Sequence, residues 1–164
     1  MEIRYGKMED AESLALAIQN VEDSGFMLFN PGERKLTKES AEKMINALAK
    51  EPNAIIVAIN ESVVNGYLFI KGESVSRVKH RASVAVVGVC DFARRQGVAQ
   101  QMFEQAHIFA KEKGLHRLQI SVIATNEAAI QLYEKMGYVR EGIYKDAIYM
   151  NGNYADELVL AKLF

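Results

Sequence analysis

The sequence predicts a single α/β domain built on a mixed β-sheet with helices on both faces. Three observations carry this prediction. A strand, a helix and a second strand follow one another in the middle of the chain, hairpins stand on either side of that unit, and 164 residues are the length of one domain. A strand–helix–strand unit makes its two strands parallel, whereas hairpins are antiparallel, so the sheet contains both pairings.

The first half of the chain is predicted to form one strand, two helices and a hairpin. Asp10 and Thr37 are the expected N-caps of the helices, because apolar residues recur after each at the spacing of one helix face. The polar turn Asn60–Ser62 joins two apolar strands. The elements are a strand at Glu2–Tyr5, a helix with Leu14, Ala17, Ile18 and Val21 buried, a helix with Ala41, Met44, Ile45 and Leu48 buried, and strands at Ala54–Ile59 and Val63–Ile70.

The second half alternates strands with helices and ends in a hairpin. Ser83–Cys90 is valine-rich and nearly all apolar, which predicts a strand buried on both faces. The helix at Gln96–Lys113 carries an apolar stripe and stops at Gly114. Asn151-Gly152 is the pair favoured in a type I′ hairpin turn. The remaining elements are a strand with Leu118, Ile120 and Val122, a helix at Asn126–Met136 ended by Gly137, and strands at Tyr138–Met150 and Tyr154–Leu163.

The composition limits the classes of partner and of chemistry. With 20 basic and 21 acidic residues the formal charge is −1, which argues against a nucleic-acid partner held by bulk electrostatics. The single cysteine, Cys90, excludes an internal disulfide and a cysteine-built zinc site and suits a reducing compartment. Met1–Lys7 lacks the apolar core of a signal peptide, and no apolar run reaches the ~20 residues of a membrane span. We therefore expect a cytoplasmic protein with no metal ion and no membrane partner.

The turn between the Ser83–Cys90 strand and the next helix is the first candidate site. The first amides of a helix have no intrahelical partner, and the helix dipole adds partial positive charge there. Arg94 and Arg95 add formal charge, while Gly97 and Ala99 leave room for a ligand close to the backbone. A phosphate site and a solvated turn explain this spacing equally well. Neither the Walker loop nor the dinucleotide-binding glycine pattern is present.

Two motifs give the chain a resemblance to a known family. Arg94-Arg95-Gln96-Gly97-Val98-Ala99 matches the Arg/Gln-x-x-Gly-x-Gly/Ala motif of the GNAT superfamily of N-acetyltransferases. The segment from Asn126 to Tyr138 resembles the family's Asn-x-x-Ala-x-x-Leu-Tyr-x-x-x-Gly-Phe helix, and the tail from Asn151 to Asp156 resembles that of many bacterial members. The resemblance covers the whole chain. It implies one GNAT domain, residues 1–164, with a centrally splayed sheet of about seven strands.

The resemblance also implies acetyl-CoA as the acetyl donor and gives roles to the matching residues. The pantetheine arm would run beside Val87–Val89, with a backbone N–H near Val89 as the oxyanion donor. Asn126 would contact the cofactor, a role compatible with capping its helix. Tyr133 would be the general acid, because a phenol of pKa ~10 can protonate a thiolate of pKa about 8.5; the local pattern alone places it in an apolar stripe. The pyrophosphate would be held by Arg94, Arg95, Gln96, Gly97, Val98 and Ala99.

The general base is not identified, because the Ser83–Cys90 strand contains no acidic residue. Deprotonation would then proceed through a chain of water molecules or use a carboxylate from another element. Four carboxylates are candidates, although each is better explained as a solvated or structural charge: Glu22, Asp23, Asp156 and Glu157. Gly88 indicates either a β-bulge or close packing under a helix. Cys90, near the same site, is interpreted as a packing residue.

The acceptor pocket of the family is built from the first two helices, their joining loop and the terminal hairpin, here Glu22–Lys35 and Tyr144–Tyr154. The apolar Phe26–Phe29 run either lines this pocket or packs on the sheet. A small-molecule primary amine is favoured over a protein N-terminus as acceptor, because no broad acidic docking stretch is present. The alternative to an enzyme is a catalytically silent acyl-CoA-binding module. A homodimer through the terminal hairpin is a further family-level expectation.

Overall fold

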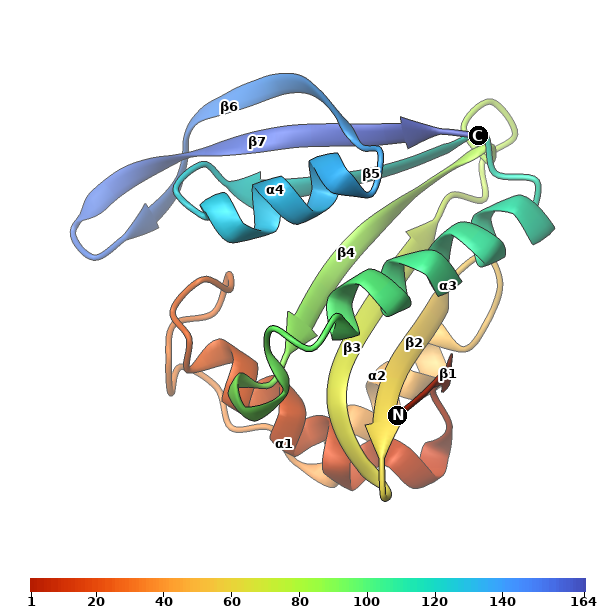
Figure 1. The fold of residues 1–164 in the computed structure, drawn as a ribbon, viewed down its shortest axis with the longest axis vertical. Helices are drawn as coiled ribbons and strands as arrows, with labels where there is room; N and C mark the ends of the chain where they lie inside the picture. Colours follow the sequence, from red (N-terminus) through yellow and green to blue (C-terminus); the bar gives the residue numbers. More distant parts are fainter.

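The protein folds around one seven-stranded mixed sheet. The computed structural model describes all 164 residues, and the strand order is β1-β2-β3-β4-β5-β7-β6 (Figure 1). Only the pairing of β4 with β5 is parallel. The predicted fold class is therefore confirmed. The strands are β1 (Glu2–Tyr5), β2 (Ala54–Asn60), β3 (Val63–Gly72), β4 (Arg81–Val89), β5 (Arg117–Ile123), β6 (Val139–Met150) and β7 (Asn153–Leu163).

Two helices cover each face of the sheet (Figure 1). α1 (Ala11–Glu22) and α2 (Lys38–Leu48) lie on one face, and α3 (Val98–Glu112) and α4 (Glu127–Lys135) lie on the other. Successive side chains of a strand point to opposite faces, so Ile55 of β2 packs under α1 and α2 while Ile56 packs under α3. None of the four helices is both long and apolar enough to span a bilayer.

The sheet opens between β4 and β5. The two strands pair only from Arg81 opposite Arg117 to Ser83 opposite Gln119. Beyond these residues β4 stays with β3, whereas β5 follows β7, so the two strands diverge (Figure 1). The divergence leaves backbone groups of both strands without a neighbouring strand, and it creates the opening in which the candidate site lies.

This opening overturns one prediction. The Ser83–Cys90 strand is not buried on both faces, because Ala85 is exposed and Val86 and Val87 are only half-buried in the second half of β4. The residues are apolar for another reason, namely that they line a hollow rather than a core. Of the two interpretations of Gly88, the β-bulge is wrong: the register of β4 shifts at Ala85, which has no partner on β3.

The helix and turn signals are mostly confirmed. Thr37 caps α2, since its Oγ accepts from the N–H of Ser40 at 3.2 Å. Asn151 (φ 52°) and Gly152 (φ 77°) both have left-handed backbone conformations, as a type I′ turn requires. The hairpin of β6 and β7 is therefore set by the local sequence.

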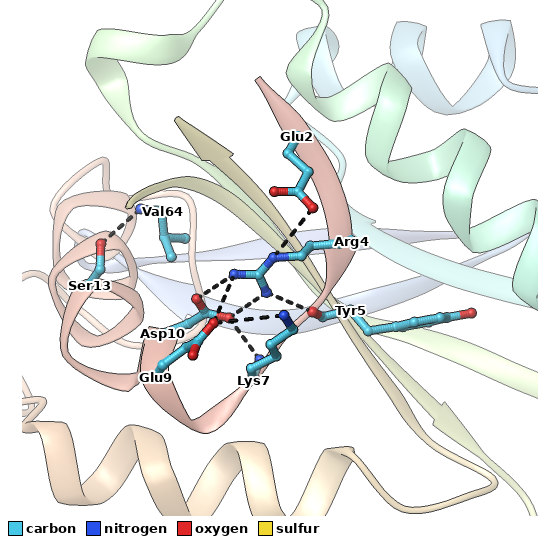
Figure 2. Close-up of polar contacts among 8 residues, drawn as sticks. All are labelled: Glu2, Arg4, Tyr5, Lys7, Glu9, Asp10, Ser13 and Val64. Carbon is cyan, nitrogen blue, oxygen red and sulfur yellow. Dashed lines mark hydrogen bonds and ion pairs between the residues drawn. The ribbon is translucent and has the colours of Figure 1, made fainter. Parts of the chain in front are cut away.

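Asp10 precedes α1 but does not cap it, which corrects that prediction. Its carboxylate instead accepts from both terminal nitrogens of Arg4, each at 2.8 Å, and from the N–H of Lys7 at 2.7 Å (Figure 2). Burial raises the pKa of Asp10, but these hydrogen bonds outweigh burial and hold the pKa below its ordinary value. Near the start of the same helix, Ser13 Oγ accepts from the N–H of Val64 at 2.8 Å. The network ties β1 and α1 to the sheet.

Candidate active site

The turn that leads into α3 has the form of an anion-binding site. A 3-10 turn (Asp91–Ala93) follows β4, and the chain then passes through Arg95 (φ 61°) and Gly97 (φ 75°), both left-handed. No side chain caps α3, so its first amides are free for a ligand. A Cβ added to Gly97 would meet nothing closer than 3.9 Å. The glycine therefore serves both the backbone conformation and an open approach to the amides.

A cavity of about 630 Å³ lies over this turn and reaches α4. Arg94 is held against the turn by its Nε, which donates to the carbonyl of Val89 at 3.2 Å. Of the predicted cofactor residues only Gln96 lies off the cavity, because its side-chain amide donates to the carbonyl of Phe92 at 3.1 Å. The predicted residues that line the cavity are Val87, Val89, Arg94, Arg95, Gly97, Val98, Ala99, Asn126 and Tyr133.

Asn126 starts α4 and also borders this cavity. Its Oδ1 accepts from the N–H of Ala129 at 3.2 Å, which confirms the capping role. Its contact with a cofactor stays a prediction.

Tyr133 is part of the hydrophobic core and also borders the opening between β4 and β5. The residue is 5% exposed, and its ring packs edge-on against Phe103 with 5.4 Å between ring centroids. It also borders both the cavity over the turn and a smaller hollow of about 120 Å³ between β4 and β5. Burial raises the pKa of its phenol above the ordinary value. The hydroxyl is therefore protonated at neutral pH and has no hydrogen-bond partner in the chain.

The smaller hollow brings a carboxylate close to Tyr133. It is lined by the α1–α2 loop, β4, β5 and β7, and Glu157 is its one charged residue. Ser121 Oγ donates to Glu157 at 2.7 Å. Two of the other candidate bases are less well placed: Asp156 is bound by Lys145 Nζ at 2.7 Å, and Asp23 is exposed at the end of α1.

A third cavity, of about 430 Å³, lies between α1, α2, their joining loop and the middle of the sheet. It shares Met27 and Leu28 with the hollow between β4 and β5. The loop's apolar run therefore lines these cavities, in agreement with the first of its two interpretations. Eleven of the 14 lining residues are hydrophobic, and the charged ones are Glu22, Arg34 and Lys71.

Glu22, the fourth candidate base, is 2% exposed and forms an ion pair with Arg34. Tyr67, also on the wall of the third cavity, is completely buried. Tyr67 was not predicted as a site residue, and Arg34 was included only as part of the predicted pocket segment Glu22–Lys35, because neither belongs to a motif. A lone arginine following an apolar loop segment was the only available signal.

Gly88 and Cys90 have packing roles near the site. A Cβ on Gly88 would lie 2.7 Å from Val21 Cγ1 and 2.9 Å from the hydroxyl of Tyr67, so the glycine permits this close approach under α1. Burial raises the pKa of Cys90 to about 11, and its Sγ lies 3.6 Å from the carbonyl of Val64. A protonated, buried thiol is inert, which agrees with its interpretation as a packing residue.

Residues 3–159 match the family described as Acetyltransferase (GNAT) domain. The chain belongs to the GNAT acetyltransferase family. This GNAT protein is 28% identical over 138 residues to the mycothiol acetyltransferase of Jonesia denitrificans, covering 82% of this chain but 41% of that enzyme. It is 30% identical over 111 residues to the L-amino acid N-acetyltransferase AaaT of Escherichia coli K12, covering 66% of this chain and 67% of the relative. The chain therefore spans less than half of the mycothiol enzyme.

Solved structures of the family share the fold along its whole length. A GNAT-family acetyltransferase from Streptococcus pneumoniae superposes with a TM-score of 0.91 at 26% identity, covering 99% of both chains. The acetyltransferase yncA from Salmonella typhimurium, solved with its cofactor acetyl-CoA, superposes with a TM-score of 0.88 at 16% identity, covering 99% of this chain and 93% of its own. The centrally opened seven-stranded sheet is thus the fold of this family.

Proposed function

We propose that this GNAT protein transfers the acetyl group of acetyl-CoA to a primary amine of a small molecule. One observation carries the proposal: the uncapped start of α3, two arginines and the ring of Tyr133 border a single cavity at the opening of the sheet. The free amides and Arg94 and Arg95 suit a pyrophosphate. The opening beside Val87–Val89 suits an extended arm that pairs with unpaired backbone groups. The acetyl-CoA complex of yncA supports the choice of ligand.

The thioester supplies an activated acetyl group. During transfer the amine nitrogen bonds to the acetyl carbon, the carbon–sulfur bond breaks, and the electron pair leaves on sulfur. Tyr133 gives its phenolic proton to that sulfur. Burial raises the proton affinity of the phenol, and a thiolate that leaves into the same water-poor opening would have its proton affinity raised in the same direction. A backbone N–H near Val89 would stabilise the charge that builds on the carbonyl oxygen.

The amine must lose a proton, either to a carboxylate or through a chain of water molecules. Glu22 and Glu157 are the two of the four candidates that border the connected cavities. A rate profile against pH separates them. We compare the profiles of Glu22→Gln and Glu157→Gln. The variant in which the rate no longer decreases toward acidic pH identifies the proton acceptor.

A small acceptor is favoured over a protein N-terminus, because the cavity on the acceptor side is lined mostly by hydrophobic side chains and no broad acidic stretch for docking a peptide borders it. The name of the E. coli relative, an L-amino acid N-acetyltransferase, supports a small acceptor as well.

The test is Tyr133→Phe, assayed by thiol release from acetyl-CoA across a panel of amines and peptides. We expect kcat to fall by roughly 10²-fold or more, as for the loss of a general acid, while the Kd for acetyl-CoA changes little. An unchanged kcat would remove Tyr133 from the chemistry. Tight acetyl-CoA binding with no turnover on any acceptor would favour the silent binding module instead.

The terminal hairpin is proposed as a homodimer contact. β6 is exposed along nearly its whole length, with Ile143 at 52% and Tyr149 at 66% exposure. A monomeric mass in light scattering, at concentrations above those of the assay, would contradict this.

A further inference from the structure

An incomplete polar cluster lies on the wall of the third cavity, which is otherwise apolar. It consists of Glu22 at the end of α1, Arg34 in the following loop and Tyr67 on β3. Arg34 Nε lies 3.0 Å from Glu22 Oε1, and the same oxygen also accepts from Arg34 Nη2. The guanidinium is held from one side by the ring of Phe29, 3.8 Å below its central carbon. The position of Arg34 is therefore fixed before any ligand arrives.

Each member of the cluster has unused hydrogen-bonding capacity. Arg34 Nη1 makes no hydrogen bond, and Glu22 Oε2 has only one long contact, at 3.3 Å from Arg34 Nε. The hydroxyl of Tyr67 is buried and has no partner. Buried polar groups in folded proteins are nearly always satisfied, and leaving one unsatisfied is costly. The Tyr67 hydroxyl is such a buried, unpartnered group, and it lies on the same cavity wall as the part-exposed Arg34, whose Nη1 is free for a ligand. Together they indicate a polar ligand.

We propose that this cavity binds an apolar α-amino acid as the acetyl acceptor. Glu22 receives the ammonium group, Arg34 Nη1 with the Tyr67 hydroxyl receives the carboxylate, and the acceptor's side chain occupies the space lined by Met27, Phe29 and Met44. This assignment rests on the acetyltransferase activity proposed above and specifies its substrate class.

Charge and geometry both favour this ligand. An acidic and a basic group lie in direct contact, and an α-amino acid carries an ammonium and a carboxylate separated by one carbon. A plain amine would offer no acceptor to the free Nη1 of Arg34, and a peptide N-terminus would present an amide where the carboxylate belongs. A cavity of about 430 Å³ with mostly hydrophobic walls accommodates a large apolar side chain.

The proposed acceptor cavity adjoins the opening of the sheet, where the acetyl group would lie. It shares Ala85 and Val86 of β4 with the hollow between β4 and β5, and Tyr133 borders that hollow. Glu22 lines the acceptor cavity, so an amine that it binds lies in a space that adjoins the opening of the sheet.

The first experiment uses the unmodified protein and measures kcat/KM for thiol release with L-leucine, L-phenylalanine and L-methionine. Each is compared with its amide and with the amine that lacks the carboxylate. We expect the free amino acids to be preferred by about 10- to 100-fold, the range of a charge-assisted hydrogen bond. Equal kcat/KM values for the three forms would overturn the proposal.

The second experiment assigns the preference to Arg34. Arg34→Gln should raise KM for the free amino acids by about 10-fold or more, and the amides should change far less. Arg34→Lys should restore part of the preference. Lys35→Gln removes a positive charge from an exposed neighbouring position and is the matched control, with no change expected. If Lys71→Gln instead of Arg34→Gln removed the preference, the carboxylate would be bound elsewhere and the assignment would be wrong.

The outcomes separate this proposal from the one on which it depends. Unchanged acetyl-CoA affinity in Arg34→Gln shows that the variant is folded, even though the loss of the ion pair with buried Glu22 is expected to lower its melting temperature. Transfer to amines without any effect of the carboxylate contradicts the substrate class alone. Absence of both acetyl-CoA binding and transfer contradicts the acetyltransferase activity itself.

Discussion

Gly88→Ala tests the tight contact between β4, α1 and Tyr67. The added Cβ would lie 2.7 Å from Val21 Cγ1 and 2.9 Å from both Cζ and the hydroxyl of Tyr67. Carbon atoms in contact normally stand about 3.5–4.0 Å apart, so the neighbours must move by roughly 1 Å. Tyr67 is fully buried and Val21 is 4% exposed. Neither side chain can turn out into solvent to relieve the clash.

The expected cost follows from overpacking a closed site. Inserting one methyl group into a well-packed core typically costs about 1–3 kcal/mol. In a chain of this size each kcal/mol lowers the melting temperature by roughly 2–4 °C, so we expect a decrease of about 2–12 °C. The displaced Tyr67 should also raise KM for the acceptor more than it changes acetyl-CoA affinity.

The assay is thermal unfolding followed by circular dichroism, with urea unfolding as a check on the free energy. Gly142→Ala is the matched control, because a Cβ at Gly142 meets no atom within 4 Å and the residue lies on exposed β6. A melting temperature for Gly88→Ala equal to that of Gly142→Ala would refute the packing argument.

Three further predictions concern the cofactor turn and the titrating groups. Gly97→Glu should weaken acetyl-CoA binding by at least roughly 10-fold in calorimetry. The new carboxylate would face the pyrophosphate, and the backbone at Gly97, with φ 75°, is unfavourable for a residue with a side chain. An unchanged affinity would show that the pyrophosphate does not bind at this turn. Asp10→Asn should lower the free energy of unfolding by about 1–3 kcal/mol at pH 7. Because the pKa of Asp10 is lowered in the folded state, this difference should shrink in urea titrations as the pH falls below the ordinary aspartate pKa. Burial and the nearby Lys162 lower the pKa of His107 to about 4, so the unfolded chain binds a proton first as the pH falls. Stability should decrease from about pH 6.5 toward pH 4, and His107→Gln should show a shallower decrease.

Local signals predicted the elements well where neighbours in the sequence decide the structure. Thr37 caps its helix with Ser40, three residues away, and Asn151-Gly152 forms its turn without tertiary help. Asp10 was predicted as a cap on the same local grounds. Its carboxylate instead binds Arg4, because a charged donor forms a stronger hydrogen bond than a backbone amide.

The candidate site was predicted where a contiguous motif carries it. The turn from Arg94 to Ala99 is one such motif, and all of it except Gln96 lines the cavity. On the acceptor side the segment Glu22–Lys35 was predicted, but the cluster of Glu22, Arg34 and Tyr67 was not, because these residues meet only through the packing of α1 and its following loop on β3. The exposure of Val86 and Val87 was missed for a similar reason: a strand that lines a hollow and a strand in a core have the same apolar composition.

The divergence of β4 and β5 has a mechanical consequence. Three residue pairs are all that join β1–β4 to β5–β7 by backbone pairing. The association of β1–β4 with β5–β7 therefore also depends on side chains that pack across the opening, among them Phe103 of α3. Its ring packs against Tyr133 of α4 with 5.4 Å between ring centroids and against Tyr138, just before β6, with 5.7 Å. Phe103 of α3 therefore helps to hold the two parts of the sheet together, and the nearer of these two aromatic neighbours is Tyr133, the proposed proton donor.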